Sequence, residues 1–593
     1  MPARYTSERF VGRDDAFMKL ASLLQSASAG EAGALLIDGT AGIGASRFID
    51  ETVRRVAALH EPMLLIRGGA YGPGTDRPYA PVIRALRPVL AGLPDPDLEA
   101  VVGSAADELA RLLPELAARI GGQTDEGRRR FTTVAERRQA RLLEGVLGVV
   151  SRLSERQPVL FVLEDLHRAD AGTRTLMSFL ARIARSQRLA IVGTYQGDAI
   201  RRDDPWSVDL RALERAPRAP QHLSLGPLGR DDLARLIGSI EGERPSASVL
   251  VIVAERSGGR PLLAEELLAA RRELPTVSLT SSFDDLVLAR IAARSPECRR
   301  VLRLLAPAGR PLGRSTMAAI AEVFERAAAS APPRSSSAPR RGDGVLDADL
   351  TAGLDEGTEF GFIVEGPDGL ALRHELVGRA IEADLLPTAR VRHHAAVATA
   401  MADHPFMAMH HHLIGHDAPA AGLAAVAASD AAAIVDAPAD ELAALELAIS
   451  VRGAAELGSV GRRTRRSRPT RTAAASVDGG KARSTGEDVT LTDLDRRAAE
   501  AAFAAGQAGR AAAYLDAVIA GSDARRDRAR LGLTYDRLGQ VLRVAGDADG
   551  ALAARRRAVE LVPAGPSQAR AAVVAGLAQV RMLEGTFSES ERL

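Results

Sequence analysis

The sequence contains few cysteines, lysines and aromatic residues, and it has no long hydrophobic run. Cys298 is the single cysteine, so no disulfide can form within the chain, and a reduced, cytoplasmic setting is the simplest expectation. No apolar run approaches the length needed to span a bilayer, and the first 15 residues lack the apolar centre of a signal peptide. The composition therefore predicts no membrane partner.

Lysine occurs only at positions 19 and 481, and almost all of the positive charge is carried by arginine. The formal net charge of the 593 residues is +1, so the overall field favours neither nucleic acid nor an anionic surface. A chain of this length exceeds a single core, and its hydrophobic share of 46% is ordinary for globular protein. We therefore expect several domains, with helices packed through abundant alanine.

Four short apolar runs indicate the strands of the first domain: residues 34–38, 63–67, 158–165 and 189–195. Each run is almost continuously apolar, as in strands that are buried on both faces of a parallel sheet. Helical stretches such as 46–60 and 133–154 lie between them. This alternation predicts an α/β layered domain.

Residues 35–48, LLIDGTAGIGASRF, have the pattern of a phosphate-binding loop between a strand and a helix. Gly39, Gly42 and Gly44 lack the Cβ atoms that would block a phosphate, and Ser46 offers a hydroxyl for Mg²⁺. Ala45 stands where such a loop normally carries lysine. The pattern is therefore partial, and a simple strand-to-helix turn is the alternative.

Two carboxylates, Glu164 and Asp165, end the apolar run 158–165. Acids at the tip of a buried strand suit the positioning of Mg²⁺ and water, whereas a pair of solvated loop acids is the alternative. The glycine loop upstream favours the first interpretation.

Beyond residue 229 the pattern is mostly helical, over residues 230–240, 261–274 and 284–325. Residues 360–376 resemble a β-hairpin around GPDG followed by a helix, an order that suits a winged-helix domain. The low-complexity stretch 328–344 predicts a disordered insertion. The arginine-rich stretch 459–488 is expected to be a flexible linker, with a nucleic-acid or membrane tail as the alternative.

Residues 535–563 match a tetratricopeptide repeat, a helix pair in which Gly539, Ala551 and Ala558 hold small positions. Arg555 stands where this motif usually has an aromatic residue. A weaker copy over 577–593 ends inside its expected second helix, so we expect the chain to be a fragment or its reading frame to have ended early.

Several segments occur in an order that is typical of one family: FVGRDDAFMKLASLL (10–24), the glycine loop, VLEDLHRAD (162–170), VGTYQGD (192–198), LGPLGRDDLARLI (225–237), RSGGRPLLAEELL (256–268) and RHELVGRAIEADLLP (373–387). With these segments the chain resembles the signal-transduction ATPases with numerous domains, particularly the large ATP-binding regulators of the LuxR type and MalT-like proteins. The resemblance implies a multidomain chain: a P-loop nucleotide-binding domain of the AAA type (1–218), a helical lid (219–283), a winged-helix-like domain (284–400), helical repeats (401–458), a disordered basic linker (459–490) and truncated TPR-like repeats (491–593).

The resemblance also implies roles for single residues. By this resemblance Val11, Gly12 and Arg13 lie beside the adenine. The phosphates are surrounded by Gly39, Thr40, Ala41, Gly42, Ile43, Gly44, Ala45, Ser46 and the adjacent Arg47. Glu164 and Ser46 take the Mg²⁺ positions, and Asp165 polarises the attacking water. Gln196 stands at the phosphate-sensor position, Pro261 packs on the base, and His374 either reaches the β-phosphate or is an interface histidine.

Three positions depart from the family pattern together: Ala45 replaces lysine, Gln196 replaces a sensor arginine, and Glu164 replaces aspartate. A charge-assisted hydrogen bond contributes about 1.5–3 kcal/mol, so losing one weakens nucleotide binding roughly ten- to a hundredfold, and hydrolysis suffers more. Arg47 turns away from Ser46 around the helix and is not expected to replace the lysine. We therefore expect binding of ATP or ADP with slow or absent turnover, and weak or dispensable Mg²⁺.

The resemblance implies a nucleotide-controlled transcription regulator whose repeats bind an unidentified inducer or protein partner, with nucleotide-dependent oligomerisation. It places the DNA-binding helix-turn-helix after the repeats, so DNA contact is expected only through a domain that these residues do not include. A pseudo-ATPase scaffold that binds a protein through its repeats and never contacts DNA is the alternative. An active stand-alone ATPase would need another group to do the work of the missing lysine.

Two smaller features complete the sequence-based expectations. His412 and His416, in MHHHLIGHD (409–417), are spaced as two metal ligands on one helix face, but no further ligand accompanies them, so a helix surface in the first repeat is the preferred interpretation. Trp206 is expected in a polar loop after the last strand.

Overall fold

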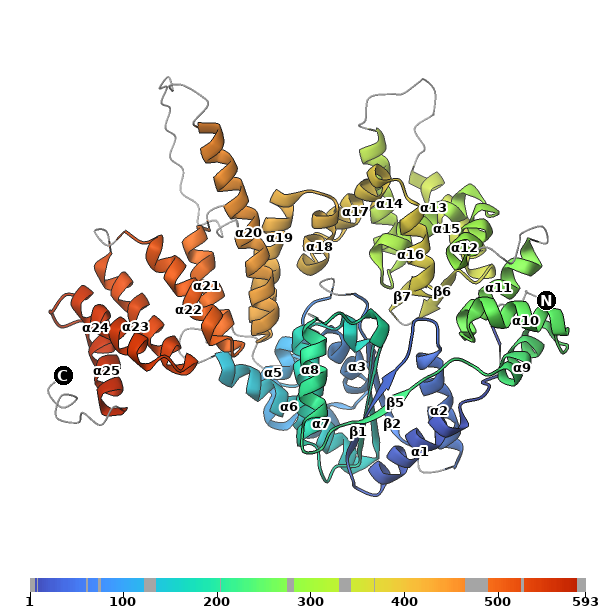
Figure 1. The fold of residues 1–593 in the computed structure, drawn as a ribbon, viewed down its shortest axis with the longest axis horizontal. Helices are drawn as coiled ribbons and strands as arrows, with labels where there is room; N and C mark the ends of the chain where they lie inside the picture. Colours follow the sequence, from blue (N-terminus) through green and yellow to red (C-terminus); the bar gives the residue numbers. More distant parts are fainter. Residues whose placement is uncertain are drawn as a thin grey trace. The chain divides into compact units, whose positions relative to one another are not determined.

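The computed structural model describes residues 6–7, 9–59, 62–72, 76–121, 135–202, 204–274, 282–329, 343–366, 368–463, 489–523 and 527–583. The chain divides into two compact units, here called the N-terminal unit (residues 1–124 and 142–417) and the C-terminal unit (residues 125–141 and 418–593). None of the described helices is long and apolar enough to cross a membrane. The labels of Figure 1 are used for all elements.

The N-terminal unit contains a five-stranded sheet in the order β2-β3-β4-β1-β5, and all of its described pairings are parallel. The strands are β1 (Gly33–Asp38), β2 (Leu64–Gly69), β3 (Val159–Glu164), β4 (Leu189–Tyr195) and β5 (Gln221–Ser224). The first four confirm the expected runs. No apolar run indicates β5, because three of its four residues are exposed at the edge of the sheet.

The parallel arrangement places three sequence features at one edge. The glycine loop follows β1, the acid pair ends β3, and Gln196 follows β4, which lies between those two strands. The register pairs Asp38 with Tyr195, so β1 and β4 end level with each other. In open parallel sheets ligands bind outside the carboxyl ends of the strands, and this edge is therefore where a site is expected.

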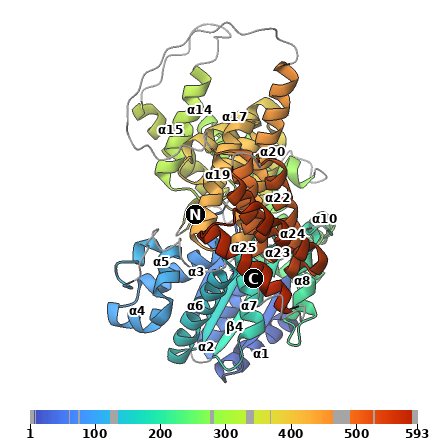
Figure 2. The ribbon, with the colours of Figure 1, turned by 90° about the vertical axis from the view of Figure 1, so that its left-hand side faces the viewer.

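Helices cover both faces of the sheet. The α-helices that precede β5 in the described chain are α1 (Asp14–Ser28), α2 (Ala45–Leu59), α3 (Ala80–Ala91), α4 (Asp95–Val102), α5 (Ala106–Leu112), α6 (Ala135–Arg156), α7 (Ala171–Ile183) and α8 (Pro205–Glu214). Side chains of α1 and α2 share one buried cluster with alternate residues of β1, β3 and β4. On the opposite face α7 packs beside β4, as Figure 2 shows, where Met177 fills the space above Gly193.

The next three helices form a small bundle of their own: α9 (Arg230–Glu241), α10 (Ala247–Ser257) and α11 (Pro261–Glu273). Their apolar faces meet around Leu233, Ile237 and Leu267, and Val11 from the start of the chain packs against this cluster. Two of the three helices coincide with the segments in which helical spacing is evident from sequence. This bundle lies within residues 219–283, for which a helical lid is predicted.

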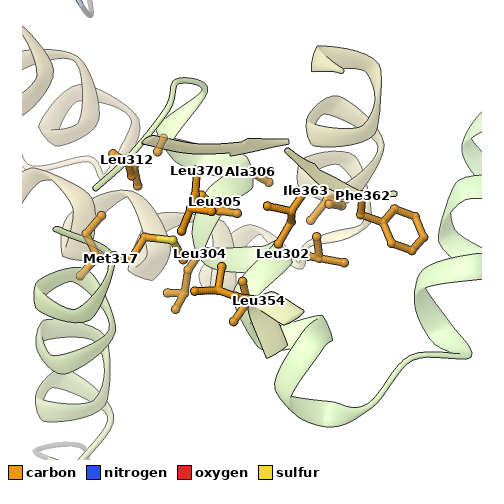
Figure 3. Packing of buried hydrophobic residues seen from close by; sticks show 14 of the residues in the cluster. Leu302, Leu304, Leu305, Ala306, Leu312, Met317, Leu354, Phe362, Ile363 and Leu370 are labelled. Atoms are coloured by element: carbon orange, nitrogen blue, oxygen red, sulfur yellow. The ribbon is translucent and has the colours of Figure 1, made fainter. Parts of the chain in front are cut away.

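Residues 283–417 pack around a single hydrophobic core, shown in Figure 3. The elements are α12 (Phe283–Ala292), α13 (Pro296–Ala308), α14 (Arg314–Ala329), α15 (Asp343–Glu359), β6 (Ile363–Gly366), β7 (Gly369–Leu372), α16 (Glu375–Asp384), α17 (Pro387–Ala400) and α18 (Pro405–Ile414). The antiparallel hairpin of β6 and β7 confirms the hairpin prediction, and Leu312 adds an isolated bridge to Leu370. Cys298 is fully buried in this core, where burial raises the pKa of its thiol to about 12.

The C-terminal unit consists of helices that pack on their neighbours in sequence. They are α19 (Ala418–Ile434), α20 (Pro438–Arg463), α21 (Leu491–Ala504), α22 (Ala508–Ala520), α23 (Arg528–Ala545), α24 (Ala548–Leu561) and α25 (Gln568–Leu583). In the pair of α23 and α24, Gly539 allows close approach, because a Cβ there would lie 2.9 Å from the Ala551 carbonyl oxygen. Arg555 is buried beside Asp536, at 3.7 Å, in place of the usual aromatic residue.

Several expectations need correction or lie outside the described residues. The linker does not begin at residue 459, because α20 continues to Arg463; residues 464–488 are outside the described part of the chain. Most of the expected insertion 328–344 and the end of the second repeat copy also lie outside it. Trp206 is not in an exposed loop: it lies in the first turn of α8, fully buried, and its ring meets Tyr195 edge to face.

Candidate functional site

The glycine loop has the backbone conformation of an anion cradle. Gly42 and Gly44 have φ values of +78° and +88°, which residues with a Cβ atom rarely adopt. Among the described residues no acceptor pairs with the backbone N–H groups of Gly42, Gly44, Ala45 and Ser46. Buried or half-buried N–H groups normally find partners, so these donors at the start of α2 are available to an anion.

A cavity of about 630 Å³ opens in front of this loop. Its walls come from three parts of the N-terminal unit: the carboxyl edge of the sheet, the start of α11, and the region of α13, the hairpin and α16–α18. The sequence-predicted residues that line it are Gly39, Thr40, Ala41, Gly42, Ile43, Gly44, Ala45, Ser46, Arg47, Asp165, Gln196, Pro261 and His374. Val11, Gly12, Arg13 and Glu164 are not among its lining residues.

The start of the chain and the helical bundle α9–α11 both contact the glycine loop. Arg13 donates to the backbone oxygen of Ile43, and burial lowers the pKa of its guanidinium to about 10 although Asp232 opposes the shift. The N–H of Leu262 donates to the carbonyl oxygen of Gly42 at 3.2 Å, next to Pro261. The residues Val11, Gly12 and Arg13 therefore contact the outer side of the loop and the α9–α11 bundle.

Arg47 does not occupy the place of the missing lysine. Its guanidinium donates to the carbonyl oxygens of Ser7 and Arg9, the latter at 3.2 Å, and lies 3.5 Å from Glu265 of α11. These three acceptors direct the Arg47 side chain toward the start of the chain and the lid. Ala45 thus leaves the centre of the loop without a cation of its own.

Glu164 and Ser46 are adjacent, as magnesium ligands would be. The Ser46 hydroxyl lies 3.4 Å from Glu164 Oε2, while Arg67 donates to Glu164 Oε1 at 2.8 Å. Burial raises the pKa of Glu164, and Arg67 opposes that shift. A Mg²⁺ ion bound with phosphates needs only one or two protein ligands, so the pair fits the ion, but Arg67 already neutralises the carboxylate. Within the described residues no cluster of three or more His, Cys, Asp or Glu residues could hold a metal.

Asp165 has the strained backbone of a residue at the end of a strand. Its φ is +57°, and its N–H donates to Thr194 Oγ1 at 3.0 Å. Burial, followed by the charges of Glu164 and Glu375, raises the pKa of Asp165 to about 7. Near neutral pH this carboxyl therefore exchanges a proton readily, a property suited to polarising water.

Gln196 is engaged by the helical region opposite the sheet. Its side-chain amide donates to Glu375 Oε1 at 3.0 Å, and Arg168 pairs with the other oxygen of the same carboxylate. The backbone N–H of Gln196 donates to His167 Nδ1 at 3.3 Å. Glu375 thereby engages the side-chain amide of the residue at the expected phosphate-sensor position.

His374 caps the helix that begins at Glu375. Its Nδ1 accepts a hydrogen bond from the Leu376 N–H at 3.1 Å, and burial lowers the pKa of the ring to about 4. The neutral ring therefore carries its proton on Nε2, which leaves one donor. Both interpretations of this residue, phosphate contact and interface histidine, are compatible with that arrangement.

His412 and His416 do not share a helix face, so the spacing that suggested two metal ligands is not realised. Helix α18 ends at Ile414, and His416 lies beyond it with φ +56°. Nor is the segment a simple helix surface: His411 is fully buried, and its Nδ1 lies 2.8 Å from His394 Nδ1. The segment therefore contributes to the far wall and support of the cavity, together with His410.

Sequence reasoning missed the groups on the helical wall of the cavity, chiefly Arg373, Glu375 and Arg379. In the segment RHELVGR the sequence alone points only to the family pattern and to His374. The spacing of Glu375 and Arg379, four residues apart at a helix start, was the signal available, because such residues share one helix face.

The fold is that of an α/β P-loop domain: a parallel sheet, a glycine loop before a helix, and acids at the end of a strand in the same sheet. Residues 9–192 match the family model described as the AAA ATPase domain. This match spans α1 to β4 and includes the loop and the acid pair. None of the curated proteins matches the chain.

The solved structures that are similar to the chain include the following three. One is the signal transduction ATPase with numerous domains that carries a tetratricopeptide repeat sensor, from Pyrococcus horikoshii, at 12% identity and a TM-score of 0.36, covering 99% of this chain and 83% of that one. The second is a Walker-type ATPase of Pyrococcus abyssi, at 13% identity and a TM-score of 0.30, covering 64% and 98%. The third is a RuvB mutant of Thermotoga maritima, at 14% identity and a TM-score of 0.25, covering 64% and 97%.

Proposed function

We propose that the N-terminal unit binds ATP or ADP and that the protein is a nucleotide-controlled regulator. The observation that carries this proposal is that the N–H groups of Gly42, Gly44, Ala45 and Ser46 have no acceptor among the described residues and lie at a cavity. These four residues belong to the segment that matches the AAA ATPase domain. Such a nest of backbone donors at a helix start is suited to a diphosphate.

In this proposal the base lies toward Pro261 and the segment from Val11 to Arg13, and the phosphates lie on residues 39–47. His374 directs its Nε2 proton to the β-phosphate. When bound, Mg²⁺ would be held by Ser46 and Glu164 and would offset phosphate charge. Asp165 holds or releases a proton near neutral pH next to the place that an attacking water would take.

Hydrolysis is proposed to be slow or absent. Two groups that would stabilise charge on the terminal phosphate are missing or engaged, because Ala45 has no cation and Gln196 bonds to Glu375. The acid proposed to hold Mg²⁺, Glu164, is already paired with Arg67. Transition-state stabilisation in phosphoryl transfer is mainly electrostatic, so these changes affect turnover more than binding.

The regulatory part of the proposal extends the resemblance to LuxR-type and MalT-like ATPases. The helix pairs of the C-terminal unit are proposed to bind an inducer or protein partner, and nucleotide state is proposed to control oligomerisation and transcription. DNA contact would come from a helix-turn-helix domain outside these residues. A cytoplasmic location fits this role.

Isothermal titration of the purified chain with ATP, ADP, GDP and AMP, with phosphate release measured in parallel, tests the proposal. Saturable binding of adenine di- or triphosphate with little turnover supports it. Brisk Mg²⁺-dependent hydrolysis would overturn the claim of weak catalysis. No binding of any nucleotide would overturn the proposal as a whole.

A second candidate function is a pseudo-ATPase scaffold that binds a protein through its repeats and does not contact DNA. The helix pair α23–α24, with its close approach at Gly539, favours a tetratricopeptide platform irrespective of the nucleotide site. Gel-shift measurements with promoter fragments and the natural full-length protein, with and without ATP, separate the two. Specific, nucleotide-dependent retardation supports the regulator, whereas its absence supports the scaffold.

A further inference from the structure

The cavity in front of the glycine loop is lined by five arginines and by no lysine. The arginines come from both sides of the cavity: Arg47 and Arg168 from the sheet side, and Arg310, Arg373 and Arg379 from the helical side. Because Ala45 removes the usual cation, one of these guanidinium groups is the natural source of positive charge for a phosphate. Their present partners decide which one is available.

Four of the five arginines already pair with carboxylates. Arg47 lies 3.5 Å from Glu265, Arg168 pairs with Glu375, Arg310 lies 3.1 Å from Asp76, and Arg373 pairs with Glu266. To bind a phosphate, each would have to give up or share an ion pair that is partly or wholly buried. Breaking such a pair is costly because the remaining carboxylate is left unpaired.

Arg379 differs from the other four. No ion pair or hydrogen bond of its side chain is formed with any described residue, and the side chain is exposed on the cavity wall. The nearest acid along its helix face, Glu382, lies 3.4 Å from His394 Nε2 instead. Arg379 is thus a charged group that faces the cavity without a counter-ion.

The place of Arg379 on α16 brings it toward the phosphate end of the cavity. Glu375, Gly378, Arg379 and Glu382 all line the cavity, so one face of α16 is turned to it. Glu375, one helical turn earlier on that face, contacts Gln196 at the end of β4. Residues four apart have Cβ atoms about 6 Å apart, which a guanidinium on its flexible stem easily spans.

We propose that Arg379 supplies, from across the cavity, the positive charge that Ala45 fails to supply, by pairing with the terminal phosphate of a nucleoside di- or triphosphate held on the loop. This inference rests on the proposed nucleotide binding. A guanidinium is charged at all relevant pH values and can donate two parallel hydrogen bonds to a phosphate. Because Arg379 has no partner among the residues that the structure describes, its engagement breaks no ion pair with them.

The experiment is a titration of the full chain with ADP, ATP and AMP, comparing wild type with Arg379→Ala, Arg379→Lys and Arg390→Ala. Arg390 is the matched control, an exposed arginine of α17 that does not line the cavity. Arg379→Ala is expected to weaken ADP and ATP binding about ten- to a hundredfold, with a smaller effect on AMP, while Arg379→Lys retains part of the affinity. Arg390→Ala is expected to match wild type.

A charge-relocation variant guards against a merely structural effect. If Arg379→Ala weakens binding because a positive charge beside the phosphates is lost, then adding Ala45→Lys to that variant restores the nucleotide affinity. Two outcomes overturn this inference and leave the proposed function standing. In the first, Arg379→Ala binds nucleotide with the same affinity as wild type. In the second, Arg379→Ala loses affinity and Ala45→Lys does not restore it. Absence of nucleotide binding by the wild-type chain overturns both.

Discussion

The side-chain amide of Gln196 donates a 3.0 Å hydrogen bond to Glu375, and Arg168 pairs with the same carboxylate. Through this one acid, the end of β4 and the segment after β3 are joined to the first turn of α16. The side chains of Arg168 and Glu375 are 23% and 25% exposed, so the ion pair is only partly screened by solvent.

The first prediction concerns the coupling of Arg168 and Glu375. Arg168→Gln and Glu375→Gln are each expected to lower the unfolding midpoint, and the double variant is expected to lose less than the sum, with a coupling energy of about 0.5–3 kcal/mol. Fluorescence of Trp206, the only tryptophan and a fully buried one, reports the transition. Strictly additive losses would show that the two side chains do not interact in solution.

The second prediction is a pH dependence set by Asp165. Its folded-state pKa is about 7, above the unfolded value of about 3.9, so the stability associated with its protonated form is fully present below pH 4 and is lost as pH rises through 7. Asp165→Asn, which mimics the neutral carboxyl, should therefore raise the unfolding midpoint more at pH 8 than at pH 5. Thermal scans across that range test it, with the exposed Glu31→Gln as control; an equal shift at both pH values contradicts the prediction.

The third prediction concerns magnesium. Arg67 is the counter-charge that opposes the rise in the pKa of buried Glu164, so in Arg67→Gln a bound Mg²⁺ would have to take over that role; ATP binding is expected to become several-fold more dependent on Mg²⁺ than in wild type. Titrations with and without Mg²⁺ measure the dependence. Adding Glu164→Gln to Arg67→Gln should abolish the gain, and a gain that persists would assign the ion to other ligands.

The fourth prediction compares two glycines of the loop. Alanine at either Gly42 or Gly44 forces a side-chain-bearing residue into the left-handed region, at a cost of about 1–2 kcal/mol. Gly42→Ala should cost more, since its Cβ would lie 3.1 Å from Leu262 Cβ, whereas the space at Gly44 is open. Unfolding curves rank the two, and Gly226→Ala, with open space and an ordinary φ, should be near neutral. Equal losses would argue against tight packing of the lid on the loop.

The fifth prediction concerns the buried arginine of the repeats. Asp536→Ala leaves the Arg555 guanidinium buried without its ion pair, so a loss of about 1–3 kcal/mol is expected. Replacing both residues, as Asp536→Leu with Arg555→Met, should lie closer to wild type, because apolar substitutes remove the desolvation cost. Unfolding followed by circular dichroism measures the free energy of unfolding of each variant. A double variant less stable than Asp536→Ala would contradict the prediction.

Apolar runs and glycine punctuation predicted much of the fold. The four continuous runs became β1 to β4, and GPDG marked the hairpin, because burial on two faces and tight turns each demand particular residues. The short exposed strand β5 and the buried Trp206 were beyond such reasoning. An edge strand needs no apolar run, and a tryptophan among polar neighbours becomes buried only through packing with distant Tyr195.

The candidate site was predictable where it is contiguous in sequence. The loop from Gly39 to Ser46 is recognisable because all of its donors come from one turn. The contacts of Gln196 with Glu375 and of Glu164 with Arg67 join residues far apart in the chain, and no local pattern specifies which charges will meet. For the same reason Arg379 could not be singled out before its neighbours were known to be paired elsewhere.

Through the hydrogen bond from Leu262 to Gly42, the conformation of the glycine loop depends on the position of α11. A rigid shift of that helix by more than an ångström or two would stretch this bond and flatten the turn beside it. The nucleotide affinity of the loop is consequently expected to change when buried side chains of the α9–α11 bundle are substituted, although these side chains do not contact a nucleotide.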